Sequence, residues 1–375
     1  MHYRRFGKTN LQLSIFSLGT MRCLDNESQT GLVIEKAIAA GINHLETAQS
    51  YGNGEIFLGQ ALKVLGVPRS SVYITTKGVP TASASAMADQ IDQSFNRLNL
   101  EYIDCFAVHG INTKTHLEWV QQPNGCMAAI REAKAKGRIR HIGFSTHGSL
   151  DVILGAIATQ QFEFINLHYY FFGQRNASAL IQAQAEDMGV FIISPADKGG
   201  LLHTPPPLLV ELCQPYSPLE LTYRFLLADH RITTLSIGPS TIEELAKPLE
   251  LGDSSHGLTS EELALLAKLE HHQQLALSAE HCRQCYECLP CPESISIPEV
   301  LRLRNLTVAF DMTQYGQYRY QMFEQAGHWF PGRKASACTA CGDCLPRCPE
   351  HLNIPDLLND THQRLQGPGR RRLWS

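Results

Sequence analysis

The sequence predicts a (β/α)8 TIM barrel followed by a small, mainly helical domain rich in cysteine. Two observations lead to this fold class. Eight short apolar runs alternate with helical stretches through the larger, N-terminal part of the chain, and eight of the 12 cysteines crowd into segments 282–291 and 338–348. Hydrophobic residues make up 43% and charged residues 18%, a balance typical of globular proteins, so we expect an ordered chain.

The eight apolar runs are rich in Ile, Val, Leu or Phe and show little alternation, as in parallel strands that helices cover on both faces. The predicted strands are 15–20, 42–47, 72–77, 103–109, 141–146, 164–170, 189–194 and 233–237. The segments between them are helical in pattern, as at 128–136, which ends before Gly137, a common helix stop. Eight βα units in about 250 residues favour a closed barrel over the alternative, an open doubly wound sheet.

The N-terminus predicts a hairpin rather than an export signal. Arg4-Arg5 resembles a twin-arginine signal, but Lys8 and Asn10 interrupt any apolar segment and no small-residue cleavage site follows. We therefore expect a hairpin that turns at 7–10 and a cytoplasmic protein. The net charge of −4 argues against nucleic acid as a partner, and no apolar run approaches the roughly 20 residues of a membrane helix.

Four polar residues stand at the ends of three consecutive predicted strands. Glu46 ends the second strand and leads to Tyr51, while Lys77 and His109 end the third and fourth. Catalytic groups of such barrels lie where strands end and βα loops begin, so we expect these side chains to meet at one mouth.

The four side chains suit the reduction of a carbonyl group. A carbonyl that accepts hydride needs a proton on its oxygen, and a free phenol, with a pKa near 10, is a weak acid at neutral pH. The Lys77 ammonium would lower the pKa of Tyr51. Glu46 would hold the lysine, and His109 could donate a hydrogen bond to the carbonyl oxygen.

The segments 42–52, 75–77, 104–109 and 137–145 resemble conserved blocks of the aldo/keto reductase family, and the resemblance covers roughly residues 1–275. It implies an enzyme that reduces a small aldehyde or ketone with NAD(P)H, with Tyr51 as general acid and Glu46, Lys77 and His109 completing a tetrad. The family usually has aspartate where this chain has Glu46. The additional methylene lengthens that side chain by about 1.5 Å, which puts rate and substrate range in question.

The nucleotide site is implied by the resemblance alone. A dinucleotide fingerprint at Gly52-Asn53-Gly54 is rejected, because its third glycine would fall at Phe57. By resemblance, NADP(H) or NAD(H) would bind at the barrel mouth. The residues implied are Gly19, Thr20, Ser145, Thr146, Asn166, Ser194, Pro195, Ala196 and Ser240.

The loop after the last predicted strand leaves the choice of nucleotide open. Family members that prefer NADP commonly carry lysine or arginine there. This chain instead continues into Glu243 and Glu244, with Lys247 as the nearby cation. The resemblance therefore favours NADP over NAD only weakly.

The two cysteine runs predict two [4Fe–4S] clusters. The run from Cys338 to Cys348 has the bacterial ferredoxin spacing, in which the cysteine before proline usually serves a second cluster. The first run is one residue shorter before Cys291, which is tolerable if that cysteine ligates the other cluster. We predict one cluster on Cys282, Cys285, Cys288 and Cys348, and the other on Cys338, Cys341, Cys344 and Cys291. Zinc is the alternative, because paired C-x2-C segments also bind zinc.

The sequence after the barrel shows a repeat. Each run ends in Cys-Pro-Glu and leads to a second proline, at Pro298 and Pro355, where a helix is expected to begin. The predicted domains are a barrel at 1–275, a helical ferredoxin-like domain at 276–366 and a flexible basic tail at 367–375.

Two functional hypotheses follow. The first is the reductase described above, in which the clusters exchange electrons with a separate protein or support the structure. Because clusters move single electrons whereas nicotinamide moves a hydride, the alternative is an iron–sulfur electron-transfer protein whose barrel is a docking scaffold with a dormant site.

Overall fold

The computed structural model describes residues 1–22, 26–253 and 257–368. The described residues form two compact units, one from Met1–Lys198 and Phe225–Gly257, the other from Gly199–Arg224 and 258–368. The predicted domain limits stay a prediction. The predicted basic tail lies largely outside the described residues, because 369–375 are not among them.

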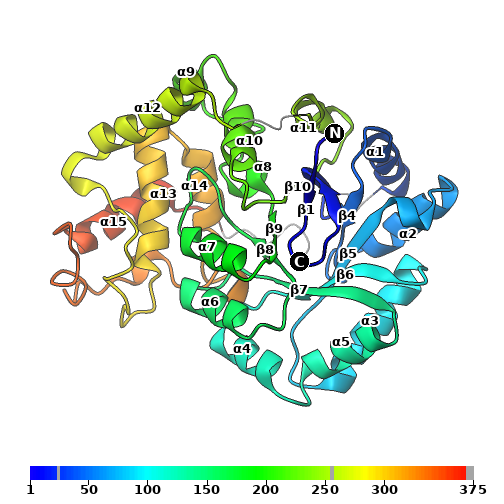
Figure 1. The fold of residues 1–375 in the computed structure, drawn as a ribbon. Coiled ribbons are helices and arrows are strands. Elements are labelled where there is room, and N and C mark those ends of the chain that lie inside the picture. The colour runs from blue at the N-terminus through cyan, green and yellow to red at the C-terminus, as the bar shows by residue number, and fades with distance from the viewer. Residues whose placement is uncertain (23–25, 254–256, 369–375) are drawn as a thin grey trace. The chain divides into compact units, whose positions relative to one another are not determined.

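The first unit is a closed barrel of eight parallel strands in the order β10-β3-β4-β5-β6-β7-β8-β9 (Figure 1). The strands are β3 Phe16–Gly19, β4 His44–Glu46, β5 Tyr73–Gly78, β6 Ile103–His109, β7 Ile139–Ser145, β8 Phe164–Leu167, β9 Gly189–Ile192 and β10 Thr234–Ile237. The predicted barrel is confirmed, and each of the eight predicted strands overlaps an observed one.

Helices connect these strands, as parallel strands require. In the first unit they are α1 Glu27–Ala39, α2 Gly54–Val64, α3 Ala84–Leu98, α4 Lys114–Gln121, α5 Cys126–Ala135, α6 Leu150–Ala158, α7 Ala177–Ala185 and α8 Pro195–Lys198, and α11 Ala246–Glu250 follows the last strand. The helix expected at 128–136 is α5. Asn26, Ser83 and Thr113 cap α1, α3 and α4 by accepting hydrogen bonds from the first helical turn.

The predicted hairpin is present as β1 Tyr3–Arg5 and β2 Gln12–Ser14, which pair antiparallel. Phe6 packs beside Phe164 and Phe191 in an apolar cluster, at the end of the strands opposite to the catalytic residues. Gly7 has a φ of 50°, and a Cβ there would lie 2.2 Å from the Gly189 nitrogen, so the turn requires glycine.

The second unit is helical. Its elements are α9 Pro207–Cys213, the N-terminal part of α10 Pro218–Ala228, α12 Ser260–Leu277, α13 Ile297–Phe310, α14 Thr313–Tyr320 and α15 Ile354–Leu365. The predicted repeat is visible, because α13 and α15 both begin at an Ile-Pro pair and pack together. Arg304 on α13, with a side chain 5% exposed, forms ion pairs with Asp360 of α15 and with Glu280.

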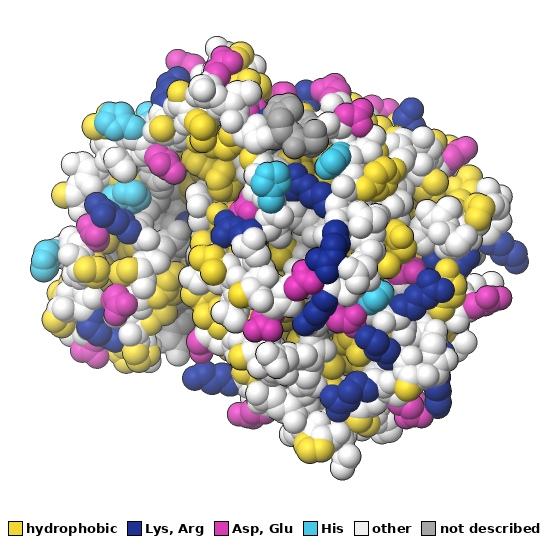
Figure 2. All heavy atoms as spheres, in the orientation of Figure 1, with side chains coloured by type: hydrophobic (Ala, Val, Ile, Leu, Met, Phe, Trp, Pro, Cys, Tyr) yellow, Lys and Arg dark blue, Asp and Glu magenta, His cyan; other side chains and the backbone are white. Residues whose placement is uncertain are grey.

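No helix within the described ranges is long and apolar enough to cross a membrane. Figure 2 shows acidic and basic side chains interspersed over the face in view, rather than a surface of one sign.

Candidate functional site

The four predicted catalytic side chains come together at the carboxyl ends of the strands. Glu46 is the last residue of β4, Lys77 lies near the end of β5 and His109 ends β6. Tyr51 lies in the loop that joins β4 to α2. All four are buried, with exposed fractions between 2% and 7%. The barrel geometry therefore brings these residues of three neighbouring strands into one enclosed site.

Lys77 is at the centre of this group. Its Nζ donates to the Thr47 carbonyl at 2.8 Å, lies 3.3 Å from the Tyr51 hydroxyl and forms an ion pair with Glu46. The rings of Tyr51 and His109 meet edge to face with centroids 5.6 Å apart. Lys77 thus contacts both Glu46 and Tyr51, and the catalytic roles of these residues stay a prediction.

Burial governs the electrostatics of the site. Desolvation lowers the pKa of Lys77 well below its ordinary value, and the charge of Lys198 acts in the same direction. The Glu46 carboxylate opposes both effects, because an adjacent anion favours the ammonium form. Burial and the charge of Lys77 lower the pKa of His44 to about 3, so His44 is neutral at physiological pH.

The Glu46→Gln substitution is expected to destabilise the fold by about 3–5 kcal/mol, because it leaves a buried ammonium without its anion. Urea unfolding at neutral pH measures the change. Glu35→Gln, at an exposed position of α1, is the matched control and should change stability by less than about 0.5 kcal/mol. A Glu46→Gln protein as stable as the parent would show that the ion pair does not support the fold.

The predicted nucleotide-binding residues lie at the same ends of the strands. Ser145 and Asn166 end or nearly end the adjacent strands β7 and β8 and are paired in register. Ser145 Oγ accepts a hydrogen bond from the Gly110 amide at 3.0 Å, and Thr146 Oγ1 donates to the Ile111 carbonyl at 2.8 Å. Both side chains thus fix the loop after β6.

The other predicted positions border the same mouth. Gly19 ends β3, where a Cβ would lie 3.2 Å from a carboxylate oxygen of Glu46. Thr20 donates its amide hydrogen to the Glu46 carbonyl at 2.9 Å. Ser194, with a φ of 44°, precedes Pro195 and Ala196 at the start of α8. Nucleotide contacts by these residues stay a prediction.

An ion pair at the loop after β10 was missed in the sequence. The Arg22 guanidinium contacts Glu244 at 2.8 and 3.0 Å, and its Nη2 donates to Ser240 Oγ at 3.1 Å. Glu244 also accepts from the Ser240 amide at 2.8 Å. The Glu244 carboxylate therefore occupies a group of donors that would suit a phosphate.

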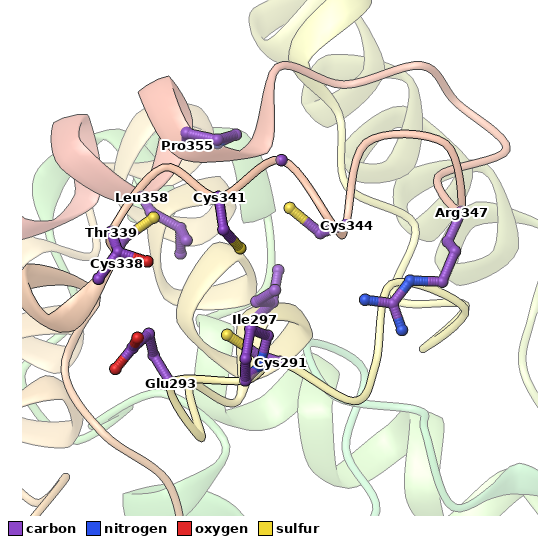
Figure 3. Close-up of a pocket in the computed structure, with 12 residues that line it drawn as sticks. Cys291, Glu293, Ile297, Cys338, Thr339, Cys341, Cys344, Arg347, Pro355 and Leu358 are labelled. Atoms are coloured by element: carbon purple, nitrogen blue, oxygen red, sulfur yellow. The ribbon is translucent and has the colours of Figure 1, made fainter.

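Four cysteines from both runs line one cavity of the second unit. They are Cys291, Cys338, Cys341 and Cys344. Figure 3 shows their sulfur atoms directed toward a shared space that Ile297 and Leu358 bound on the apolar side. This is the ligand set predicted for the second cluster, including the residue exchanged from the first run.

The remaining four cysteines influence one another. Burial, together with the nearby Cys285 and Cys348, raises the pKa of Cys282 to about 11. Burial, with Cys282 and Cys285, raises the pKa of Cys288 to about 12. Such thiols ionise when a bound cation compensates the charge, so the donor set fits a metal cluster. Cys348 of the second run acts on Cys282, and Cys344 of the second run acts on Cys288, so the two runs lie close together, while the assignment of ligands to each cluster stays a prediction.

Comparison with known proteins identifies both parts of the chain. The sequence model of the aldo/keto reductase family matches residues 16–271, and that of a 4Fe-4S dicluster domain matches residues 281–353. The second match identifies the cysteine-rich segment as an iron–sulfur domain rather than a zinc site.

Three similar proteins cover the barrel. An aldo-keto reductase of Mycobacterium avium is 26% identical over 240 residues, which is 62% of this chain and 79% of the relative. The L-galactose dehydrogenase of Arabidopsis thaliana is 27% identical over 292 residues, 71% of this chain and 88% of the relative. The holo form of an aldo-keto reductase from Bacillus halodurans has a TM-score of 0.63 at 23% identity, covering 72% and 96% of the two chains, and supports the fold.

Proposed function

Because the chain belongs to the aldo/keto reductase family and is an NAD(P)H-dependent oxidoreductase with an iron–sulfur domain, we propose that it reduces a small aldehyde or ketone by hydride transfer. The observation that carries the proposal is the position of the buried Lys77 Nζ, which lies 3.3 Å from the Tyr51 hydroxyl and pairs with Glu46. In this geometry the Tyr51 phenol can act as a general acid inside an enclosed site.

Each residue has its own role in the proposed reaction. Bound NAD(P)H supplies the hydride that reduces the carbonyl carbon. Tyr51 gives its proton to the carbonyl oxygen, and Lys77 stabilises the phenolate that remains. His109, whose Nδ1 lies 3.2 Å from Ser50 Oγ, is held where its other ring nitrogen can donate to the same oxygen. The product is an alcohol, and Tyr51 regains its proton from solvent.

Arg22 and Glu244 are proposed to decide between NADPH and NADH. Phosphate sites in such barrels commonly form in the loops after the last two strands, where this ion pair lies. The Glu244→Gln substitution should release the Arg22 guanidinium for the additional phosphate of NADPH. We expect the ratio of the NADH Kd to the NADPH Kd to rise by about tenfold, or about 1.4 kcal/mol.

Fluorescence titration of the cluster-loaded protein with each nucleotide measures this ratio. Glu243→Gln makes the same charge change at the neighbouring exposed position and is the control. An equal change in the ratio for both variants would assign the effect to net charge rather than to the Arg22 contact.

The iron–sulfur domain is proposed to hold two [4Fe–4S] clusters on the exchanged cysteine sets and to exchange electrons with a separate protein. Free thiols stay reduced and available to bind iron in the cytosol, so a cytoplasmic location is part of the proposal. The alternative is an electron-transfer protein with a dormant reductase site, which is favoured by Glu46 at the usual aspartate position and by Glu244 beside Arg22.

One anaerobic experiment separates the two functions. Cluster-loaded protein is mixed with NADPH or NADH and a reactive probe such as 4-nitrobenzaldehyde, and nucleotide oxidation is followed by absorbance. Turnover supports the reductase. A protein that binds neither nucleotide, but whose clusters accept electrons from a reduced ferredoxin, would establish the alternative.

A further inference from the structure

We propose that Arg347 sets the two clusters at different reduction potentials and makes the cluster on Cys338, Cys341, Cys344 and Cys291 the stronger electron acceptor. The proposal rests on the two-cluster arrangement of the proposed function. It concerns the direction in which electrons move between the two clusters. It is independent of carbonyl reduction.

Arg347 is the residue by which the two cysteine runs differ in length. Three residues separate Cys344 from Cys348, whereas two separate Cys288 from Cys291. Arg347 therefore has no counterpart in the first run. Its side chain lines the cavity that contains Cys291 and Cys344 (Figure 3). The insertion thus adds a cation to the cavity of the second ligand set.

Neutral groups hold this cation in place. Its Nε donates to the Asp343 carbonyl at 2.8 Å, and its Nη2 donates to the Pro290 carbonyl at 2.9 Å. Pro290 directly precedes Cys291, the exchanged ligand. These contacts fix the guanidinium between the two cysteine runs. Because both acceptors are backbone carbonyls, they do not neutralise its charge.

The second charged residue of the same cavity is already paired. Glu293 lines the cavity and accepts from Arg333 at 3.3 Å. The charges of Glu293 and Arg333 offset each other, which leaves the charge of Arg347 in excess. Among the residues that line the cavity, Arg347 therefore carries the charge that no anion of the lining offsets.

Near the first cysteine set, a carboxylate is paired with a cation of its own. The Tyr286 hydroxyl, between Cys285 and Cys288, donates to Glu299 at 2.5 Å. Glu299 forms an ion pair with Arg302 at 3.4 Å, and both side chains are 12% exposed. A buried carboxylate with its own cation contributes little net charge to the first cluster.

Reduction adds one electron, and hence one negative charge, to a cluster. A nearby positive charge stabilises the reduced form more than the oxidised form and raises the reduction potential. The excess charge of Arg347 therefore makes the second cluster easier to reduce. An electron that a one-electron donor delivers to the first cluster then moves to the second.

The test is a reductive titration of the cluster-loaded protein with dithionite, in which EPR follows the two midpoint potentials. In Arg347→Gln the higher potential should fall and the gap between the two should narrow. Glu293→Gln removes a negative charge from the same cavity and should raise the higher potential. Arg333→Gln alters an arginine with a side chain 51% exposed and should lower it less than Arg347→Gln does.

Arg347→Gln and Glu293→Gln should shift the higher potential in opposite directions. The test therefore remains valid if one of the two variants binds its clusters poorly. Unchanged potentials in Arg347→Gln and Glu293→Gln would overturn the proposal, as would a larger shift of the lower potential. A protein that binds one cluster rather than two would also overturn it. None of these readouts depends on reductase turnover, so a failure here is distinct from a failure of the proposed function.

Discussion

The Tyr51→Phe protein should lose carbonyl reduction by a factor of about 10²–10⁴ in kcat, because the substitution removes the proton donor while keeping the ring. The phenyl ring keeps the edge-to-face contact with His109 and the position above Lys77 Nζ, 4.5 Å from the ring centroid. The nucleotide Kd should stay near the parent value. Stopped-flow measurement of NAD(P)H oxidation with a reactive aldehyde gives the decrease in kcat.

The pH dependence of kcat gives a second readout. The Lys77 ammonium favours the phenolate, so the pKa of Tyr51 should fall below the roughly 10 of a free phenol. The rate in the parent protein should decline as pH rises through that pKa, because the acid is then already ionised. This decline should vanish from the residual activity of Tyr51→Phe.

Tyr73→Phe is the matched control. Tyr73 begins β5, at the end of the strand opposite to Lys77, and packs against the apolar cluster at the barrel floor. The Tyr73→Phe substitution also removes a phenolic hydroxyl, but at a position away from the catalytic residues. If Tyr51→Phe and Tyr73→Phe are equally active, Tyr51 is not the general acid and the site uses another proton source.

The barrel was predictable because its signal is local. An apolar run bounded by helical segments reads as a buried parallel strand wherever it occurs, and the closed order of β3 to β10 follows from eight such units. The convergence of Glu46, Lys77 and His109 was predictable for the same reason, since residues that end neighbouring parallel strands meet at one edge. The cluster-binding cysteines were predictable because their spacing determines which thiolates can reach one cluster.

The features that were missed depend on distant parts of the chain. Arg22 follows β3 and Glu244 follows β10, and they meet because the first and last barrel strands pair when the sheet closes. The segment Gly199–Arg224 belongs to the second unit although it precedes β10. Arg224 there forms a buried ion pair with Glu262 of α12 at 2.6 Å. Neither contact leaves a periodic or spacing signal in the sequence.

The exchange of ligands between the two cysteine runs yields the other large effect. We expect Cys291→Ala to lose the second cluster and keep the first, although Cys291 belongs to the first run. Cys348→Ala should do the reverse. In each case the iron content should fall by about half, from about eight to about four atoms per chain.

Alkylation followed by mass spectrometry identifies the cluster that is lost, because thiols that hold iron are protected. With exchange, Cys291→Ala exposes Cys338, Cys341 and Cys344 to the reagent, since these share the cavity with Cys291. Without exchange, the cysteines that react would be the other three of the first run. Cys126→Ala, at a buried position of α5, changes a thiol of the barrel and should leave the iron content unchanged.

The structure explains why such a loss should extend beyond one site. Each cluster would connect both runs, and Arg304 joins α13 to α15, the two helices that follow them. Removing either exchanged cysteine therefore cuts one of two covalent connections between the halves of the repeat. Cys291→Ala and Cys348→Ala should destabilise the second unit to a similar degree, as monitored by hydrogen exchange in α13 and α15. A variant that loses its cluster while both helices stay fully protected would mean that the helical packing supports the repeat without the clusters.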